Sequence, residues 1–317
     1  MRKRELKNIE WSIVIIAIIL SIIGLIALFS ATQEANHDEF NKQCIWLVIS
    51  IIIMAIITMV DYDLIVKASP FLYGGFILLL IAVLFTKPVN GARSWFDIGF
   101  FSFQPGEFAK VFVILFLALA INKIQEKGKS EINRITRLLI ILAIIGVPIL
   151  LIIKQPDFGT AAAFLVATAL MLITAGIDKK YIIITSILVV VSVPLLYNFI
   201  LPEHAKNRID IFLHPESDPR GSGYNIIQSK LAIGAGGLTG MGYLKGNQTQ
   251  LGFLYPKTTD FIYAVIGEEM GFVVAGSVII LYVYLVIKCL YVAKTAKDEL
   301  RFINCIRNNR NIFIPYD

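Results

Sequence analysis

Eight stretches of this chain are apolar over about the length that an α-helix needs to cross a bilayer, which takes roughly 20 residues and at least about 17. They cover approximately 11–31, 44–60, 70–86, 105–122, 138–153, 158–176, 181–200 and 261–287. Hydrophobic residues make up 57% of the 317 positions, charged residues only 16%, and the mean hydropathy is +0.74. A water-soluble fold needs more polar surface. We therefore predict an all-α, polytopic bundle of transmembrane helices with eight spans.

Several other classes of protein are disfavoured by the same sequence. The net charge of +6 could indicate nucleic-acid binding, but the basic residues are scattered between apolar runs rather than gathered in a patch. The three cysteines have no paired spacing, and the three histidines lack ligand spacing, so neither a disulfide framework nor a metal site is predicted. No small-residue cleavage site closes the first apolar run, so we expect it to be a retained helix.

The distribution of Lys and Arg predicts the orientation in the membrane. With the N-terminus in the cytoplasm, 18 basic residues fall in inside segments and 10 in outside segments. Six of those 10 lie within residues 201–260, a long loop where the positive-inside rule is weak. The sequence thus predicts a cytoplasmic N-terminus, a transmembrane domain over residues 1–297 and a polar cytoplasmic tail at 298–317. Residues 201–260 form its large extracellular loop between spans seven and eight.

Loops of this length without low-complexity character are usually functional. Within it, residues 224–233 space their apolar side chains as an amphipathic helix does, and such a helix would lie at the outer interface. A glycine cluster follows at 234–242. It matches no nucleotide-binding pattern, so we interpret it as a site of close packing or backbone freedom.

Asp260 stands where this loop enters the eighth apolar run. Taken by itself the position suits a helix N-cap, and it also suits a carboxylate at the mouth of an outer cavity. Glu268 and Glu269 lie two turns deeper, where ionisable groups are costly. Glu268 would lie roughly 80° around and about 12 Å along the helix from Asp260, with Glu269 on the opposite side. The segment is thus expected to form a cavity wall.

A second polar cluster surrounds the start of the fourth run. Glu107 and Lys110 are one helical turn apart, so they could simply pair, or they could serve function, because Lys110 enters the span. Arg93, on the outer face, suits an anionic head group. In the tight turn between the fifth and sixth runs, Pro156 ends one helix, and Asp157 can accept hydrogen bonds from the unpaired amides of the next.

Several of these motifs together resemble the SEDS family (shape, elongation, division and sporulation proteins). The matching segments are 90–95 (NGARSW), 104–110 (QPGEFAK), 154–160 (KQPDFGT), 214–219 (HPESDP), 223–229 (GYNIIQS) and 259–262 (TDFI). The resemblance runs in order to about residue 297. Its rod-shape (elongation) branch is favoured over the division branch by 227–230 (IQSK) and 246–250 (GNQTQ).

This resemblance implies a peptidoglycan glycosyltransferase of the bacterial cytoplasmic membrane. Such an enzyme polymerises lipid II outside the membrane within the elongation machinery, together with a class B penicillin-binding protein that cross-links the glycan. The proposed catalytic aspartate of the Thr-Asp-Phe motif corresponds to Asp260, acting as general base. Members of the family have ten spans, so the eight found here and the polar residues 298–317 are interpreted as an interrupted terminus.

The reaction expels a pyrophosphate, whose charge calls for cations. The candidate residues for binding the pyrophosphate and the neighbouring part of the substrate are Arg93, Glu107, Lys110, Asp157, Arg208, Lys245 and Lys257. A divalent cation, Mg²⁺ or Mn²⁺, could serve instead, although no metal ligands are indicated. Two other functions remain open, a lipid II transporter (flippase) and a non-catalytic scaffold of the cell-wall synthase. Charged residues within the spans suit a transporter. However, the sequence shows no pair of interrupted helices in repeated halves, which is the pattern that indicates alternating access.

Overall fold

The structure is a computed structural model that describes residues 10–33, 36–60, 62–88, 92–97, 99, 102–200, 203–221 and 223–310. The chain divides into two compact units. The first unit consists of Met1–Ile57 and Leu201–Asp317, and the second of Thr58–Ile200. Each unit is described by itself.

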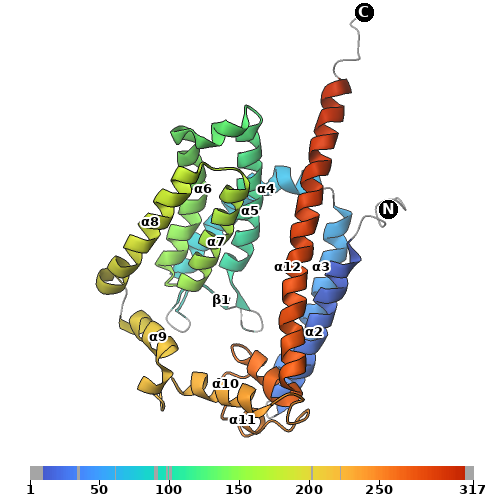
Figure 1. The fold of residues 1–317 in the computed structure, drawn as a ribbon, viewed down its shortest axis with the longest axis vertical. Helices are drawn as coiled ribbons and strands as arrows, with labels where there is room; N and C mark the ends of the chain where they lie inside the picture. The colour runs from blue at the N-terminus through green and yellow to red at the C-terminus, as the bar shows by residue number, and fades with distance from the viewer. Residues whose placement is uncertain are drawn as a thin grey trace, which may run out of the picture. The chain divides into compact units, whose positions relative to one another are not determined.

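Each predicted apolar run contains a long helix (Figure 1). These helices are α2 (Trp11–Ala31), α3 (Asp38–Met59), α4 (Tyr62–Ala82), α5 (Pro105–Gln125), α6 (Ile135–Lys154), α7 (Phe158–Thr174), α8 (Lys179–Leu195) and α12 (Ile262–Arg310). The shorter elements are η2 (Val83–Phe85), β1 (Phe96–Asp97), β2 (Ser102–Phe103), η3 (Lys129–Asn133), η4 (Leu196–Ile200), α9 (Glu203–Leu213), η5 (Pro215–Ser217), α10 (Tyr224–Ala235) and α11 (Asn247–Gln250).

Five helices in the described part of the chain are long and apolar enough to cross a membrane. They are Trp11–Ala31, Asp38–Met59, Leu64–Phe85, Ile135–Lys154 and Ile262–Val292. A sixth apolar helix, Phe158–Thr174, is shorter. The prediction of a helical membrane protein is confirmed, whereas the number of eight spans stays a prediction.

The second unit is built around contacts among α4, α5, α6 and α7. Its core is apolar and includes Leu80, Leu117, Ile141, Ile152 and Phe164, all at most 2% exposed. The short hairpin of β1 and β2, with Phe96 opposite Phe103, leads into α5. Pro105 begins that helix, where its missing amide hydrogen costs no helical hydrogen bond.

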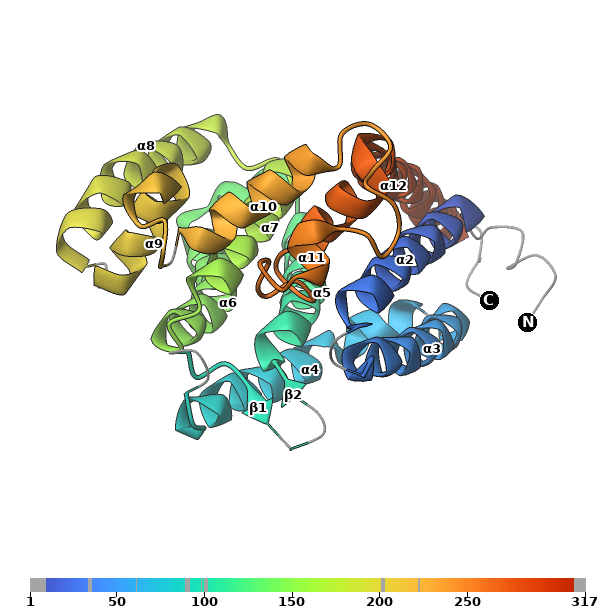
Figure 2. The ribbon, with the colours of Figure 1, turned by 90° about the horizontal axis from the view of Figure 1, so that it is seen from below.

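In the first unit, α2 packs along α12, and α10 lies across the start of α12 (Figures 1 and 2). Small buried residues, among them Ala27 and Ala31 of α2 and Ala264 and Ala275 of α12, belong to the cluster between them. Close approach through small residues is the usual way in which membrane helices gain packing energy. At the other end of the pair, Lys288 and Glu10 form an ion pair of 2.9 Å.

Half of the large loop at 201–260 has regular structure, since it contains α9, η5, α10 and α11. The amphipathic segment predicted at 224–233 is helical in the structure, as α10. Its position at the membrane interface stays a prediction.

Candidate active site

Asp260 lies in a turn that precedes α12. The turn is closed by a hydrogen bond of 3.3 Å from the Phe261 amide to the Pro256 carbonyl, and the helix begins at Ile262. The Asp260 side chain is exposed, and no residue that the structure describes donates a hydrogen bond or an ion pair to its carboxylate. The helix-cap interpretation is therefore wrong, because the carboxylate accepts nothing from the amides of α12.

A cavity of about 260 Å³ opens beside this turn, between α2, α3 and the start of α12. Its lining residues are Ser21, Gly24, Leu25, Leu28, Gln43, Leu47, Thr258 and Ile262. Thr258 and Ile262 are each two positions from Asp260 in sequence, and Asp260 itself is not a lining residue. The cavity lining is mostly apolar, which suits a hydrocarbon chain better than a sugar.

Three of the candidate cations belong to the same unit as Asp260. Lys257 is in the same turn, and its Nζ atom donates a hydrogen bond of 2.8 Å to the carbonyl of Thr249. Lys245 is exposed in the loop between α10 and α11, where its amide donates to the Gly242 carbonyl at 3.1 Å. Arg208 lies on α9, also exposed.

Glu268 and Glu269 are both buried, at 0% and 2% exposure. The Oε1 atom of Glu268 accepts from the Gln248 amide at 2.7 Å, and its Oε2 atom accepts from the amide and hydroxyl of Thr249 at 3.0 and 2.7 Å. The loop ahead of α12 folds back and covers both glutamates, since it donates to each of the two carboxylates.

Glu269 is satisfied by a different set of donors. Its Oε1 atom accepts from the Ser30 hydroxyl of α2 at 2.7 Å and from the Gln250 amide side chain at 2.8 Å. Its Oε2 atom accepts from the Leu244 amide at 3.2 Å. Nearby, the Tyr243 hydroxyl donates to the Ile26 carbonyl at 3.2 Å. Burial of that hydroxyl raises the pKa of Tyr243, and the Glu269 carboxylate adds to the shift.

The glycine cluster packs directly against α12, as the sequence predicted. Gly271 has a φ of +78° and interrupts the helix, which leaves nearby carbonyls and amides without helical partners. The loop supplies those partners, since the amides of Met241 and Gly242 donate to the carbonyls of Glu268 and Glu269 at 2.9 and 3.1 Å. In return, the amides that follow Gly271, at positions 272 and 273, donate to loop carbonyls at 2.9 and 3.2 Å.

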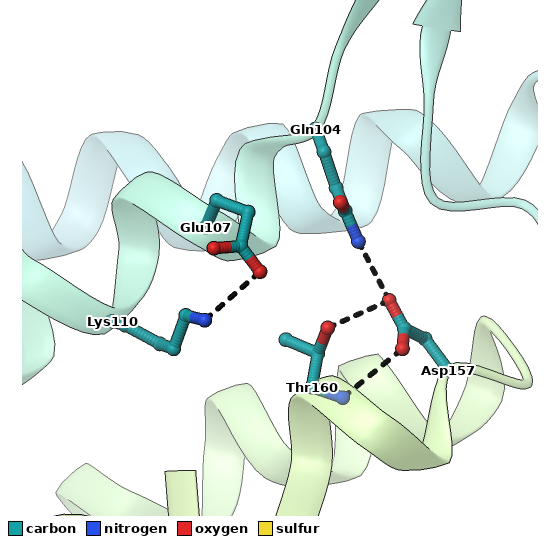
Figure 3. A network of polar contacts seen from close by, with 5 residues as sticks. All are labelled: Gln104, Glu107, Lys110, Asp157 and Thr160. Atoms are coloured by element: carbon teal, nitrogen blue, oxygen red, sulfur yellow. Dashed lines mark hydrogen bonds and ion pairs between the residues drawn. The ribbon is translucent and has the colours of Figure 1, made fainter. Parts of the chain in front are cut away.

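The second unit holds the other polar cluster (Figure 3). Asp157 caps α7, as predicted, and accepts from the amide and hydroxyl of Thr160 at 3.1 and 2.9 Å. Gln104, just before α5, donates to the same carboxylate at 2.7 Å. One turn into α5, Lys110 and Glu107 form the predicted ion pair at 2.9 Å. Asp157 therefore joins the starts of two helices.

Arg93 lies on the chain that leads to the hairpin. Its amide donates to the Gln155 carbonyl at 3.2 Å, and its guanidinium donates to the Leu84 carbonyl at 3.4 Å. The guanidinium remains exposed, as a head-group ligand requires. No three His, Cys, Asp or Glu side chains of the described residues gather where they could hold a metal ion.

The candidate residues thus fall into two groups, with Asp260, Lys245, Lys257 and Arg208 in the first unit and Arg93, Glu107, Lys110 and Asp157 in the second. Sequence reasoning missed the hydrogen-bond donors to Asp157, Glu268 and Glu269, which include Ser30, Gln104, Thr160, Thr249 and Gln250. Only Thr160 gave a usable signal, as the third residue after a capping aspartate. Ser30 and Glu269 are 239 positions apart, and no local pattern relates them.

A bundle of apolar helices with polar clusters at their ends defines a polytopic membrane protein with a site in its connecting segments. The chain belongs to the FtsW/RodA/SpoVE family, described as cell cycle proteins, whose family model matches residues 10–315.

Individual relatives agree with this assignment. The chain is 33% identical over 291 residues to the peptidoglycan glycosyltransferase MrdB of Escherichia coli (strain K12), covering 92% of this chain and 77% of MrdB. It is 30% identical over 361 residues to the peptidoglycan glycosyltransferase RodA of Treponema pallidum (strain Nichols), covering 90% of this chain and 82% of RodA. A solved structure of a peptidoglycan synthase complex that coordinates polymerization and crosslinking matches with a TM-score of 0.72 and 25% identity, covering 89% of this chain and 77% of that one.

Proposed function

We propose that this chain is a peptidoglycan glycosyltransferase that polymerises lipid II at the outer face of the bacterial cytoplasmic membrane during cell elongation. The observation that carries the proposal is the Asp260 carboxylate, which is exposed and accepts no hydrogen bond from any described residue. A carboxylate in that state is available to take a proton from a substrate. The relatives that are named peptidoglycan glycosyltransferases support the reaction class.

In the proposed reaction, a sugar hydroxyl of the acceptor attacks the anomeric carbon of the donor. The new glycosidic bond forms as the bond to the polyprenyl pyrophosphate breaks, and Asp260 takes the hydroxyl proton as general base. A pyrophosphate leaves readily without protonation, so the second carboxylic acid that a glycosidase needs is not required here. One carboxylate is sufficient.

The leaving pyrophosphate gains negative charge, which nearby cations stabilise. Lys257 is the first candidate, because it belongs to the same turn as Asp260. Lys245 and Arg208 of the same unit are proposed as further contacts to the head group. In the second unit, Arg93 and Lys110 are proposed as cations that bind substrate, and Glu107 and Asp157 as acceptors for its polar groups. A divalent cation such as Mg²⁺ or Mn²⁺ would supply the same charge.

The apolar cavity beside Asp260 supports a lipid-linked substrate. Leu25, Leu28 and Leu47 offer hydrocarbon surface, and Gly24 leaves room beside them. A polyprenyl chain held there would keep its pyrophosphate close to the turn at 257–260. We propose a class B penicillin-binding protein as the partner, in keeping with the polymerization and crosslinking that the similar synthase complex coordinates.

The test is polymerisation of labelled lipid II by the purified chain, with and without its transpeptidase partner. Glycan chains that form in either condition support the proposal, and an inactive Asp260→Asn variant assigns them to this site. Movement of lipid II across liposome membranes without glycan formation would indicate a transporter. Neither activity, with intact binding to the transpeptidase, would indicate a scaffold.

A further inference from the structure

A continuous series of hydrogen bonds connects the buried carboxylate of Glu268 to the turn that carries Asp260. The Oε2 atom of Glu268 accepts from the amide and hydroxyl of Thr249, at 3.0 and 2.7 Å. The carbonyl of the same Thr249, which is 0% exposed, accepts from Lys257 Nζ at 2.8 Å. Lys257 is three residues from Asp260. We propose that Glu268 is a positioning residue that acts through Thr249 to hold Lys257 beside Asp260.

The short helix α11 is the intermediate element. Glu268 fixes it through the Gln248 amide and both donors of Thr249. α11 in turn fixes the chain leading to Asp260, since the Leu254 amide donates to the Gln248 carbonyl at 3.1 Å and Leu254 is 1% exposed. The position of the Lys257 ammonium therefore depends on the buried carboxylate behind it.

A carboxylate suits this role because all three groups that face it are donors. Glutamine at 268 has the same shape but replaces one oxygen with an NH₂ group. In either orientation that NH₂ group would face a backbone amide that also donates, that of Gln248 or that of Thr249, and a hydrogen bond to α11 would be lost or distorted. No room is available for relaxation, since a Cβ atom at Gly246 would already lie 2.6 Å from Glu268 Oε2.

Glu269 provides a matched control within the same helix. It is equally buried and also accepts three hydrogen bonds, but its donors are Ser30, Gln250 and the Leu244 amide. Gln250 belongs to α11, as Thr249 does, but none of the three donors is Thr249, whose carbonyl accepts from Lys257. Glu269 ties the loop to α2, and Glu268 ties it to the turn that carries Asp260.

The inference rests on the proposed glycosyltransferase activity, so the first test compares Glu268→Gln and Glu269→Gln in lipid II polymerisation. Rates are expressed per molecule of folded protein. We expect Glu268→Gln to lower kcat by about tenfold or more, with KM changed by less than about threefold, because a misplaced cation acts on the leaving group in the transition state. Glu269→Gln should keep kcat close to wild type. Equal loss of kcat in both variants would overturn the proposal.

A double-mutant cycle tests the route through Lys257. If Glu268 acts by placing the ammonium, Glu268→Gln should cost nothing further in a Lys257→Met background. Additive losses would show that Glu268 does not act through Lys257. Thr249→Val removes only the hydroxyl and should reproduce a smaller part of the kcat loss, which provides a second variant if Glu268→Gln does not accumulate.

Hydrogen–deuterium exchange separates failure of this inference from failure of the proposed function, because it needs no activity. Peptides covering residues 251–262 should exchange faster in Glu268→Gln than in wild type, whereas Glu269→Gln should change exchange mainly in residues 26–33 and 241–246. Unchanged exchange at 251–262 in Glu268→Gln would refute the positioning role even if polymerisation is observed. Faster exchange there would support it even if the chain forms no glycan.

Discussion

Asp157 and Asp260 both stand just before an apolar helix, yet their carboxylates have opposite surroundings. Asp157 accepts three hydrogen bonds, from Gln104 and from the amide and hydroxyl of Thr160. Asp260 accepts none from the described residues and is exposed. The Asp260 carboxylate therefore makes no described hydrogen bond that would stabilise the fold, in keeping with the catalytic role proposed for it. The two residues therefore make a matched pair for mutation.

Asp260→Asn should reduce lipid II polymerisation by about 100-fold or more, the usual scale of a general base, because an amide cannot accept the hydroxyl proton. Its abundance and thermal unfolding should match wild type, since no hydrogen bond is removed. Glycan synthesis by purified variant and wild type, together with a thermal melt of both, provides the measurement. Polymerisation at the wild-type rate would exclude Asp260 as the base.

Asp157 is expected to behave differently. Asn is nearly as good an N-cap as Asp, so Asp157→Asn should retain most of the stability, whereas Asp157→Ala should lose about 1–2 kcal/mol through the missing cap. Thermal unfolding of the purified variants measures both effects. If Asp157→Asn unfolds like wild type but forms no glycan, the carboxylate itself contacts substrate, as its proposed binding role requires.

At the scale of elements, the contact between the glycine cluster at 234–242 and α12 depends on the absence of a Cβ atom at Gly236. A Cβ at Gly236 would collide with the Gly267 carbonyl, whereas one at Gly234 would meet nothing within 4 Å. Both glycines lie at the end of α10, so their substitution by alanine differs mainly in the space available.

Gly236→Ala should therefore destabilise the first unit by about 1–3 kcal/mol, the usual cost of forcing an extra methyl into a packed site. Gly234→Ala should be neutral or slightly stabilising, because alanine is the better helix former. Thermal unfolding of the two variants in the same detergent tests this difference. Equal stability of both variants would show that the loop can move away from α12.

Hydropathy located all eight long helices, because each run of apolar residues must be helical to satisfy its backbone in lipid. Helical geometry alone did not identify the partners of Glu268 and Glu269. An angle counted around one helix gives a direction, but it does not reveal which loop covers that direction. The helix also begins at Ile262 rather than at Asp260, so the count started outside it. The partners of these glutamates come from a returning loop and from α2, which only the fold brings together.

At the scale of the whole molecule, the proposed reaction requires residues 201–260 to face the outside, where glycan is made. Ser217 of the large loop and Ser130, between α5 and α6, are both exposed, so a cysteine at either position can report its side of the membrane. The native Cys44, Cys289 and Cys305 must first be replaced to remove background labelling.

With the N-terminus in the cytoplasm, Ser217→Cys should react with an impermeant thiol reagent in intact cells, and Ser130→Cys should react only after the cells are opened. The physical basis is the excess of Lys and Arg in the short segments assigned to the cytoplasm, which include 123–137. Labelling of both variants after permeabilisation controls for accessibility. Labelling of Ser130→Cys but not of Ser217→Cys in intact cells would reverse the orientation, and Asp260 would then face the cytoplasm, away from any site of glycan polymerisation.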